Sequence, residues 1–242
     1  MQLRKALRSA TYPQSSSEPK RYRASCLAKW FWCAEQSRHL ALGLIPEEVI
    51  DVAEIGTIGH KILEESLGKR FPWENQFIDE LAKYQDKDVG FMRDFEDAKI
   101  YCNLSAHFDD LQITKDLIVS VVEHKFVMNA NLYNIQRWKL CMASFQSQIY
   151  SWILQPIVEE LGGIMHRVNV ACFWSLETFE HIHDFDVEYK PVQTQENILR
   201  CVKAYEDPRL IIAPTEWKCR YCSQLHKELC QFEAKNKQTI QN

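Results

Sequence analysis

The sequence predicts an α/β protein in which helices flank a mixed β-sheet. A hairpin pattern at residues 104–126 and strand patterns at 167–174 and 181–189 supply the sheet, because each contains β-branched or aromatic residues. A long helical pattern at residues 132–155 lies between them, and a shorter one follows at 192–206. Strands that alternate with helices in this way are typical of the α/β class.

Length and composition favour one large domain. The chain has 242 residues, of which 46% are hydrophobic, enough to bury a substantial core. We expect a flexible basic arm at residues 1–22, a single domain at 23–232 and a polar tail at 233–242. No apolar run approaches the roughly 20 residues that span a bilayer, so we expect a soluble, cytoplasmic protein without a membrane partner. The net charge of -4 argues against a uniformly basic nucleic-acid coat but not against a local basic groove.

The first part of the domain is predicted to be helical. Residues 21–42 have apolar and aromatic side chains at helical spacing, with Ser25 as the cap and Cys33 in the middle of the helix. Residues 71–99 are mixed and charged, and we expect a helical insertion at the rim of the domain.

A second helix is expected to begin at Pro46 and to carry a candidate histidine. Gly56 and Gly59 interrupt the helical pattern just before His60. Glycines at these positions let another element approach closely, so the His60 imidazole can face a cleft. The alternative is a structural histidine that packs in the ordinary way.

The hairpin pattern carries the first chemical signal. Its two apolar runs end in acids, at Asp109 and at Glu123, on either side of a short polar connector at residues 112–116. Strand alternation places Glu123 and Lys125 on one face, and a hairpin brings Asp109 beside them. Two carboxylates and a lysine suit a hard divalent cation and a reacting phosphate. The alternative is a charged hairpin whose acids lie in water.

The long helical pattern adds two polar residues to this set of candidate residues. Gln146 and Tyr150 are four positions apart and therefore share one face of the helix, with Lys139 nearly in line with them. We expect Pro156 to end the helix.

Cysteines carry the second signal. Nine cysteines in a chain without a secretory signal favour metal binding over a disulfide framework. Cys219 and Cys222 form a C-x2-C pair, and Cys230 follows eight positions later. Three thiolates need a fourth ligand, which His226 would supply in a local zinc site and Cys33 in a four-cysteine iron–sulfur site.

Six positions, in this order, resemble the motifs of the RecB-type branch of the PD-(D/E)xK nuclease superfamily. Four of them are marked by His60, by Asp109, by the Glu123-His124-Lys125 triplet and by Gln146 with Tyr150, and the other two are the N-terminal cysteine and the C-terminal cysteine trio. One N-terminal cysteine with a C-terminal trio resembles the iron–sulfur subset of that branch. The subset includes the CRISPR-associated RecB-like exonucleases, the AddB nuclease domain and eukaryotic exonuclease V, and this chain most resembles the first. The resemblance extends over about residues 25–232.

The resemblance implies a restriction-endonuclease-like sheet and a role for each motif residue. About residues 23–45 and 214–232 would be joined by a metal cluster. The implied ligands of Mn2+ or Mg2+ are His60, Asp109, Glu123 and the backbone carbonyl of His124, and the imidazole tilts the preference toward Mn2+. The implied catalytic lysine is Lys125, and the implied strand-positioning residues are Gln146 and Tyr150. The implied ligands of a [4Fe-4S] cluster are Cys33, Cys219, Cys222 and Cys230. Asp110 is an alternative to Asp109, and Cys26 is an alternative to Cys33.

The implied activity is metal-dependent exonuclease cleavage of single-stranded DNA ends, in CRISPR spacer acquisition or in DNA repair. An integrase-like partner fits the first pathway. One alternative is a DNA-binding iron–sulfur or zinc subunit of a nuclease or integrase complex, with little or no turnover of its own. The other is a zinc-knuckle interaction protein in which the Glu123-His124-Lys125 triplet is accidental.

Overall fold

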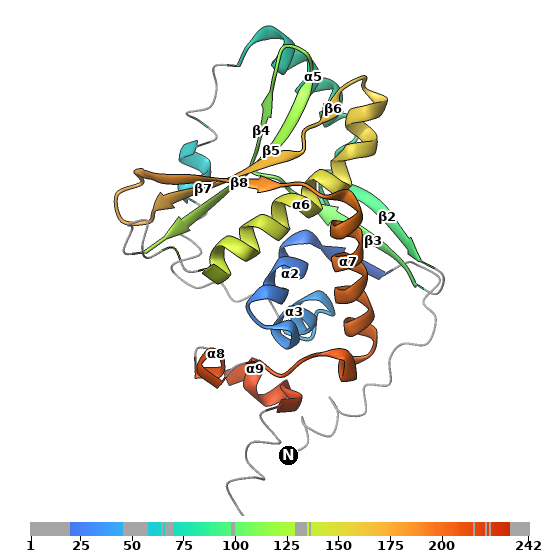
Figure 1. The fold of residues 1–242 in the computed structure, drawn as a ribbon, viewed down its shortest axis with the longest axis vertical. Helices are drawn as coiled ribbons and strands as arrows, with labels where there is room; N and C mark the ends of the chain where they lie inside the picture. The colour runs from blue at the N-terminus through green and yellow to red at the C-terminus, as the bar shows by residue number, and fades with distance from the viewer. Residues whose placement is uncertain are drawn as a thin grey trace, which may run out of the picture.

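The structure is a computed structural model that shows a mixed α/β fold with two sheets (Figure 1). It describes residues 20–45, 58–63, 65, 70–97, 100–128, 135, 137–214, 216–220, 222 and 224–232. The predicted α/β class with a mixed sheet flanked by helices is confirmed, although the described strands form two mixed sheets rather than one. In the described residues no helix is both long enough and apolar enough to cross a bilayer.

The two sheets share one long helix. The smaller sheet has the order β1 (Lys20–Arg23), β3 (Ile100–Ala106), β2 (Phe91–Asp97). The larger sheet has the order β4 (Asp110–Ile113), β5 (Ile118–Val127), β7 (Val168–Ser175), β8 (His181–Glu188), and β6 (Ile164–Met165) also pairs with β5. Helix α6 (Arg137–Glu160) contacts strands of both sheets. Ile149, Ile153 and Leu154 of α6 are fully buried, so this helix forms the centre of the core.

Helices at the two ends of the chain lie side by side beneath α6 in Figure 1. They are α2 (Ala24–Ala28), the short 3-10 helix η1 (Lys29–Phe31), α3 (Ala34–Ala41), α7 (Pro191–Glu206), the 3-10 helix η3 (Pro208–Leu210), α8 (Glu216–Arg220) and α9 (Gln224–Leu229). Helix α7 was predicted within one residue, and Pro191 occupies its first turn as expected.

The predicted single helix at residues 21–42 is wrong. The segment begins as strand β1, and Arg23 rather than Ser25 occupies the N-cap of α2. Lys20 donates a hydrogen bond of 2.6 Å to Glu206, and Tyr22 donates one of 3.0 Å to the same carboxylate. These contacts with the end of α7 and the pairing with β3 override the local helical pattern. Residues 20–22, which were expected in the arm, therefore belong to a strand of the smaller sheet.

The predicted helical insertion at residues 71–99 is only half right. Helix α5 (Pro72–Ala82) forms, but residues 91–97 form strand β2, which pairs antiparallel with β3. Phe91 and Phe95 are the buried side chains of β2, and their spacing of four suits a helix as well as a strand. The pairing of β2 with β3 makes this segment a strand rather than a helix.

Several expectations lie outside the described residues. They concern residues 1–19 of the arm, the tail at 233–242, and Pro46 and Gly56 at the start of the second helix.

Pro156 does not end the helix, because α6 continues to Glu160. A proline inside a helix leaves the carbonyl four residues earlier without its donor, here that of Trp152. The Arg93 guanidinium from β2 donates a hydrogen bond to this carbonyl and lies 3.7 Å from the centroid of the Trp152 ring. Arg93 thereby compensates for the missing N–H and lets the helix pass through the proline.

Replacement of Arg93 by methionine is expected to lower the free energy of unfolding by about 1–3 kcal/mol, because it leaves a buried acceptor unsatisfied. Urea denaturation at equilibrium measures the change. Arg209→Met is the matched control, since that side chain is largely exposed and we expect a change within about 0.5 kcal/mol. Equal losses in both variants would show that Arg93 has no special role in α6.

Candidate active site and cysteine cavity

Strand β5 carries the predicted Glu123 and Lys125, and its hairpin with β4 brings Asp109 near them. The first strand of the hairpin is shorter than expected, because β3 ends at Ala106 and β4 begins only at Asp110. Glu123 lies in the middle of β5 with none of its surface exposed, and Lys125 on the same face forms an ion pair with it. The alternation expected from the sequence is therefore confirmed. Burial excludes the reading in which Glu123 lies in water.

Asp109 lies beside this pair, just before β4. One of its carboxylate oxygens accepts a hydrogen bond of 2.8 Å from the backbone N–H of His124. The other lies 3.6 Å from Nδ1 of His60, which belongs to the helical residues 58–63. The imidazole of His124 accepts a hydrogen bond of 3.0 Å from Trp174 on β7. Asp109 therefore contacts both His60 and the backbone of His124.

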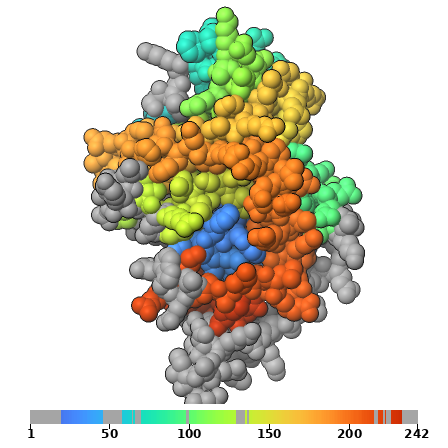
Figure 2. Space-filling model, viewed as in Figure 1, coloured from blue at the N-terminus to red at the C-terminus, as the bar shows by residue number. Residues whose placement is uncertain are grey.

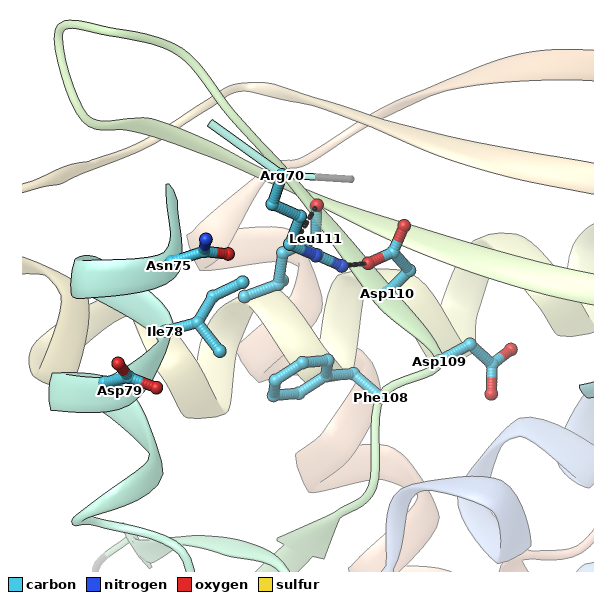
Figure 3. Close-up of a pocket in the computed structure, with 8 residues that line it drawn as sticks. All are labelled: Arg70, Asn75, Ile78, Asp79, Phe108, Asp109, Asp110 and Leu111. Carbon is cyan, nitrogen blue, oxygen red and sulfur yellow. Dashed lines mark hydrogen bonds and ion pairs between the residues drawn. The ribbon is translucent and has the colours of Figure 1, made fainter. Parts of the chain in front are cut away.

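The choice between the two neighbouring acids follows from Arg70. Its guanidinium forms an ion pair with Asp110 and donates a hydrogen bond of 3.3 Å to the carbonyl of Leu111. Figure 3 shows this contact at the wall of a pocket, with the Asp109 carboxylate directed away from Arg70. Asp110 is thus occupied by a structural ion pair, and Asp109 is the acid near His60. No motif in the sequence identifies Arg70.

Helix α6 supplies the next two residues. Lys125 donates a hydrogen bond of 3.1 Å to Oε1 of Gln146, and Nε2 of Gln146 donates one of 2.6 Å to the Tyr150 hydroxyl. The expected spacing on one face of the helix is confirmed, and it connects α6 to the triplet on β5. Burial, and then the charges of Glu123 and Asp109, raise the pKa of Tyr150 well above its usual value, so its hydroxyl keeps its proton.

Glu123 has the most perturbed environment of the site. Burial, and next to it the Asp109 carboxylate, raise the pKa of Glu123 to about 8. Burial also disfavours charge on Lys125, but the two carboxylates outweigh it and hold the pKa of Lys125 above its usual value. Apart from its ion pair with Lys125, neither carboxylate oxygen of Glu123 accepts a hydrogen bond from the described residues. A buried carboxylate of this kind fits a cation ligand.

The described side chains do not by themselves form a closed metal site. Among these described side chains, no group of three or more His, Cys, Asp or Glu residues is arranged closely enough to hold a metal ion. The donor set nevertheless suits a hard divalent cation, because it offers two carboxylates and one imidazole.

Gly59 permits the close approach that was expected before His60. A Cβ atom at this position would lie 2.4 Å from the tip of the Phe126 ring, a distance that real side chains do not adopt. The His60 ring meets the same Phe126 ring edge to face at 5.3 Å. Phe126 therefore fixes the imidazole over the end of β5, a role that the sequence did not reveal.

The four expected cysteines line one cavity. Cys33 stands at the N-cap of α3 rather than inside a helix, and the C-terminal trio meets it there. The lining residues of the cavity are Trp32, Cys33, Pro214, Lys218, Cys219, Cys222, Lys227 and Cys230. Burial raises the pKa of Cys222 to about 12, with further contributions from the other three thiols of the cavity. None of the nine cysteines, all within described residues, forms a disulfide.

The two alternative ligands lie elsewhere. Cys26 is buried in α2, where its carbonyl accepts a hydrogen bond of 2.7 Å from Ser37. His226 is buried and stacks on His39, with 3.1 Å between their Nδ1 atoms. The Nε2 atom of His39 lies 3.7 Å from the Oε1 atom of Glu35. Neither Cys26 nor His226 lines the cysteine cavity.

Comparison with known proteins gives a likeness of fold. No protein-family model and no curated protein matches the chain. Among solved structures, the crystal structure of SSO0001 is similar with a TM-score of 0.56 and 14% identity, over 96% of this chain and 94% of that one. A "Putative exonuclease" from Eubacterium rectale matches with a TM-score of 0.47 and 12% identity, over 94% and 92% of the two chains. The first match extends over nearly the whole of both chains and shows a shared fold.

Proposed function

We propose that this protein is a metal-dependent nuclease that hydrolyses phosphodiester bonds at single-stranded DNA ends. One observation carries the proposal above all. Glu123 is fully buried, forms an ion pair with Lys125 and lies beside the partly exposed Asp109, which contacts His60. Burying a carboxylate next to a second carboxylate is costly, and such an arrangement is typical of a cation site or of catalytic chemistry.

The residues that would hold the cation are Asp109, Glu123 and His60, with the backbone carbonyl of His124 as a further ligand. A divalent cation at this place lowers the pKa of water and offsets the charge of the scissile phosphate. The side chains of Asp109 and His60 are about one-fifth and one-third exposed, so the site is open to a strand from solution.

Lys125 is held ready for the reaction by two neighbours. Glu123 and Gln146 fix its ammonium from two sides, and Tyr150 fixes Gln146 in turn. A positioned ammonium can orient the attacking water or donate to a phosphate oxygen as negative charge develops there. Gln146 and Tyr150 are thus positioning residues for Lys125 as well as candidate contacts of the strand.

We further propose that Cys33, Cys219, Cys222 and Cys230 hold a [4Fe-4S] cluster. Four thiols from the two ends of the domain around one cavity suit this cluster. A zinc site with His226 as fourth ligand is less favoured, because that imidazole is engaged with His39. The cluster would act as a clip between the N-terminal helices and the C-terminal segment.

The isolated protein is expected to degrade linear single-stranded DNA in Mn2+ or Mg2+ and to lose this activity in EDTA. Fluorescent oligonucleotides labelled at the 5′ or the 3′ end, separated on a denaturing gel, measure the reaction. A covalently closed single-stranded circle is the matched control and should resist an exonuclease. Binding of the linear strand without turnover in either metal would contradict the proposal and favour a DNA-binding subunit.

A further inference from the structure

A cluster of aromatic rings and ammonium groups lies between the candidate active site and the cysteine cavity. Trp32, at the end of η1, and Trp138, in the first turn of α6, pack with ring centroids 4.5 Å apart. The Lys218 ammonium lies 5.5 Å from the centroid of Trp32, and the Lys139 ammonium lies 5.6 Å from that of Trp138. These four side chains are called the Trp–Lys surface below.

The surface is continuous with both sites. Lys139 precedes Gln146 by seven residues on α6, which is nearly two turns, so the two side chains share one stripe about 10 Å apart. Trp32 and Lys218 at its other end line the cysteine cavity. In Figure 2 atoms of the N-terminal helices are visible between α6 and the C-terminal segment.

The Trp–Lys surface is fixed in place, although its rings are not part of the buried core. Phe31, next to Trp32, meets the buried Phe145 ring of α6 edge to face at 5.3 Å. Lys218 also donates a hydrogen bond of 3.2 Å to the Phe31 carbonyl. All four side chains of the surface keep part of their area accessible to solvent.

We propose that the Trp–Lys surface binds the unpaired DNA strand as it enters or leaves the active site. The proposal rests on the nuclease function proposed above and names the path of its substrate. Rings that stack on bases, flanked by cations that contact phosphates, are the chemistry by which proteins hold single strands without reading sequence. Lys139 then contacts a phosphate next to the strand segment held at Gln146, and the tryptophans stack on bases farther along.

The test measures binding apart from cleavage, in EDTA, by the fluorescence anisotropy of a labelled 20-nucleotide oligo-dT. Trp138→Ala is expected to raise the Kd about tenfold or more, as loss of a base-stacking ring does. Lys139→Gln is expected to reduce the slope of log K against log salt by about 0.7, the value for one phosphate contact on a single strand. In Mn2+, both variants should show a higher KM and a retained kcat on long strands.

Two control variants isolate the surface. Tyr101→Ala removes an exposed ring from β3, and Lys203→Gln removes an exposed cation from α7, and both should bind like the wild type. Lys139→Gln removes only a partly exposed side chain, so it remains informative if Trp138→Ala fails to fold. Wild-type affinity and an unchanged salt slope in Lys139→Gln would overturn the proposal, as would an oligo-dT that the wild type does not bind. Binding that depends on the Trp–Lys surface without any cleavage would instead remove the proposed nuclease function and leave the surface standing.

Discussion

Replacement of Lys125 by alanine is expected to reduce DNA cleavage at least about 100-fold while the protein still binds single-stranded DNA. The variant removes the ammonium that Glu123 and Gln146 hold in place, but it leaves the Trp–Lys surface untouched. End-labelled DNA in Mn2+ measures cleavage, and anisotropy in EDTA measures binding. Thermal unfolding shows whether the buried Glu123 carboxyl tolerates the loss of its partner.

The matched control for this variant is Lys115→Ala. Lys115 lies exposed in the turn between β4 and β5. Its replacement therefore changes the net charge by the same amount as Lys125→Ala but leaves the candidate active site intact. We expect the control to cleave like the wild type. Full activity in Lys125→Ala, or an equal loss in Lys115→Ala, would remove Lys125 from the candidate active site.

Replacement of Cys33 by alanine is expected to remove the brown colour and the absorbance near 400 nm (roughly, for an iron–sulfur chromophore) together with the iron. The Tm should fall by at least about 5 °C, because a clip between positions far apart in the chain restricts the unfolded state most. Cys33 and Cys219 lie 186 positions apart. DNA processing should decline together with stability, and we expect the same losses in Cys219→Ala.

Cys26→Ala provides the control for that experiment, since Cys26 is also buried, lies seven residues earlier and does not line the cavity. It is expected to retain colour and iron. Colour that survives in Cys33→Ala but disappears in Cys26→Ala would reverse the choice of ligand. A colourless wild-type protein with bound zinc would replace the cluster by a zinc site.

The parts of the candidate site that depend on a local, periodic pattern of side chains could be predicted from the sequence. Alternation in β5 places Glu123 and Lys125 on one face, and helical spacing places Gln146 above Tyr150, whatever surrounds them. Helix α7, the strands β7 and β8 and the α/β class were predicted for the same reason.

The parts that could not be predicted depend on contacts between distant residues. Residues 20–23 form a strand because Glu206 and β3 bind them, and α6 passes through Pro156 because Arg93 replaces a missing donor. The ion pair that sets Asp110 apart from Asp109 comes from Arg70, forty positions earlier. The packing of Trp32 against Trp138 has no local pattern either, since the two rings are 106 positions apart.

The cysteine cavity has a consequence for how the protein is made in the cell. Cys33 precedes the other three cysteines of the cavity by at least 186 positions. A cluster with these ligands can be completed only after the ribosome has synthesised the chain through Cys230. The β5 strand and α6, which carry the candidate active-site residues, are synthesised before that moment. Iron delivery would then follow the synthesis of the candidate active site, and a cell short of iron would accumulate chains in which that site is formed but the C-terminal segment is not held to Cys33.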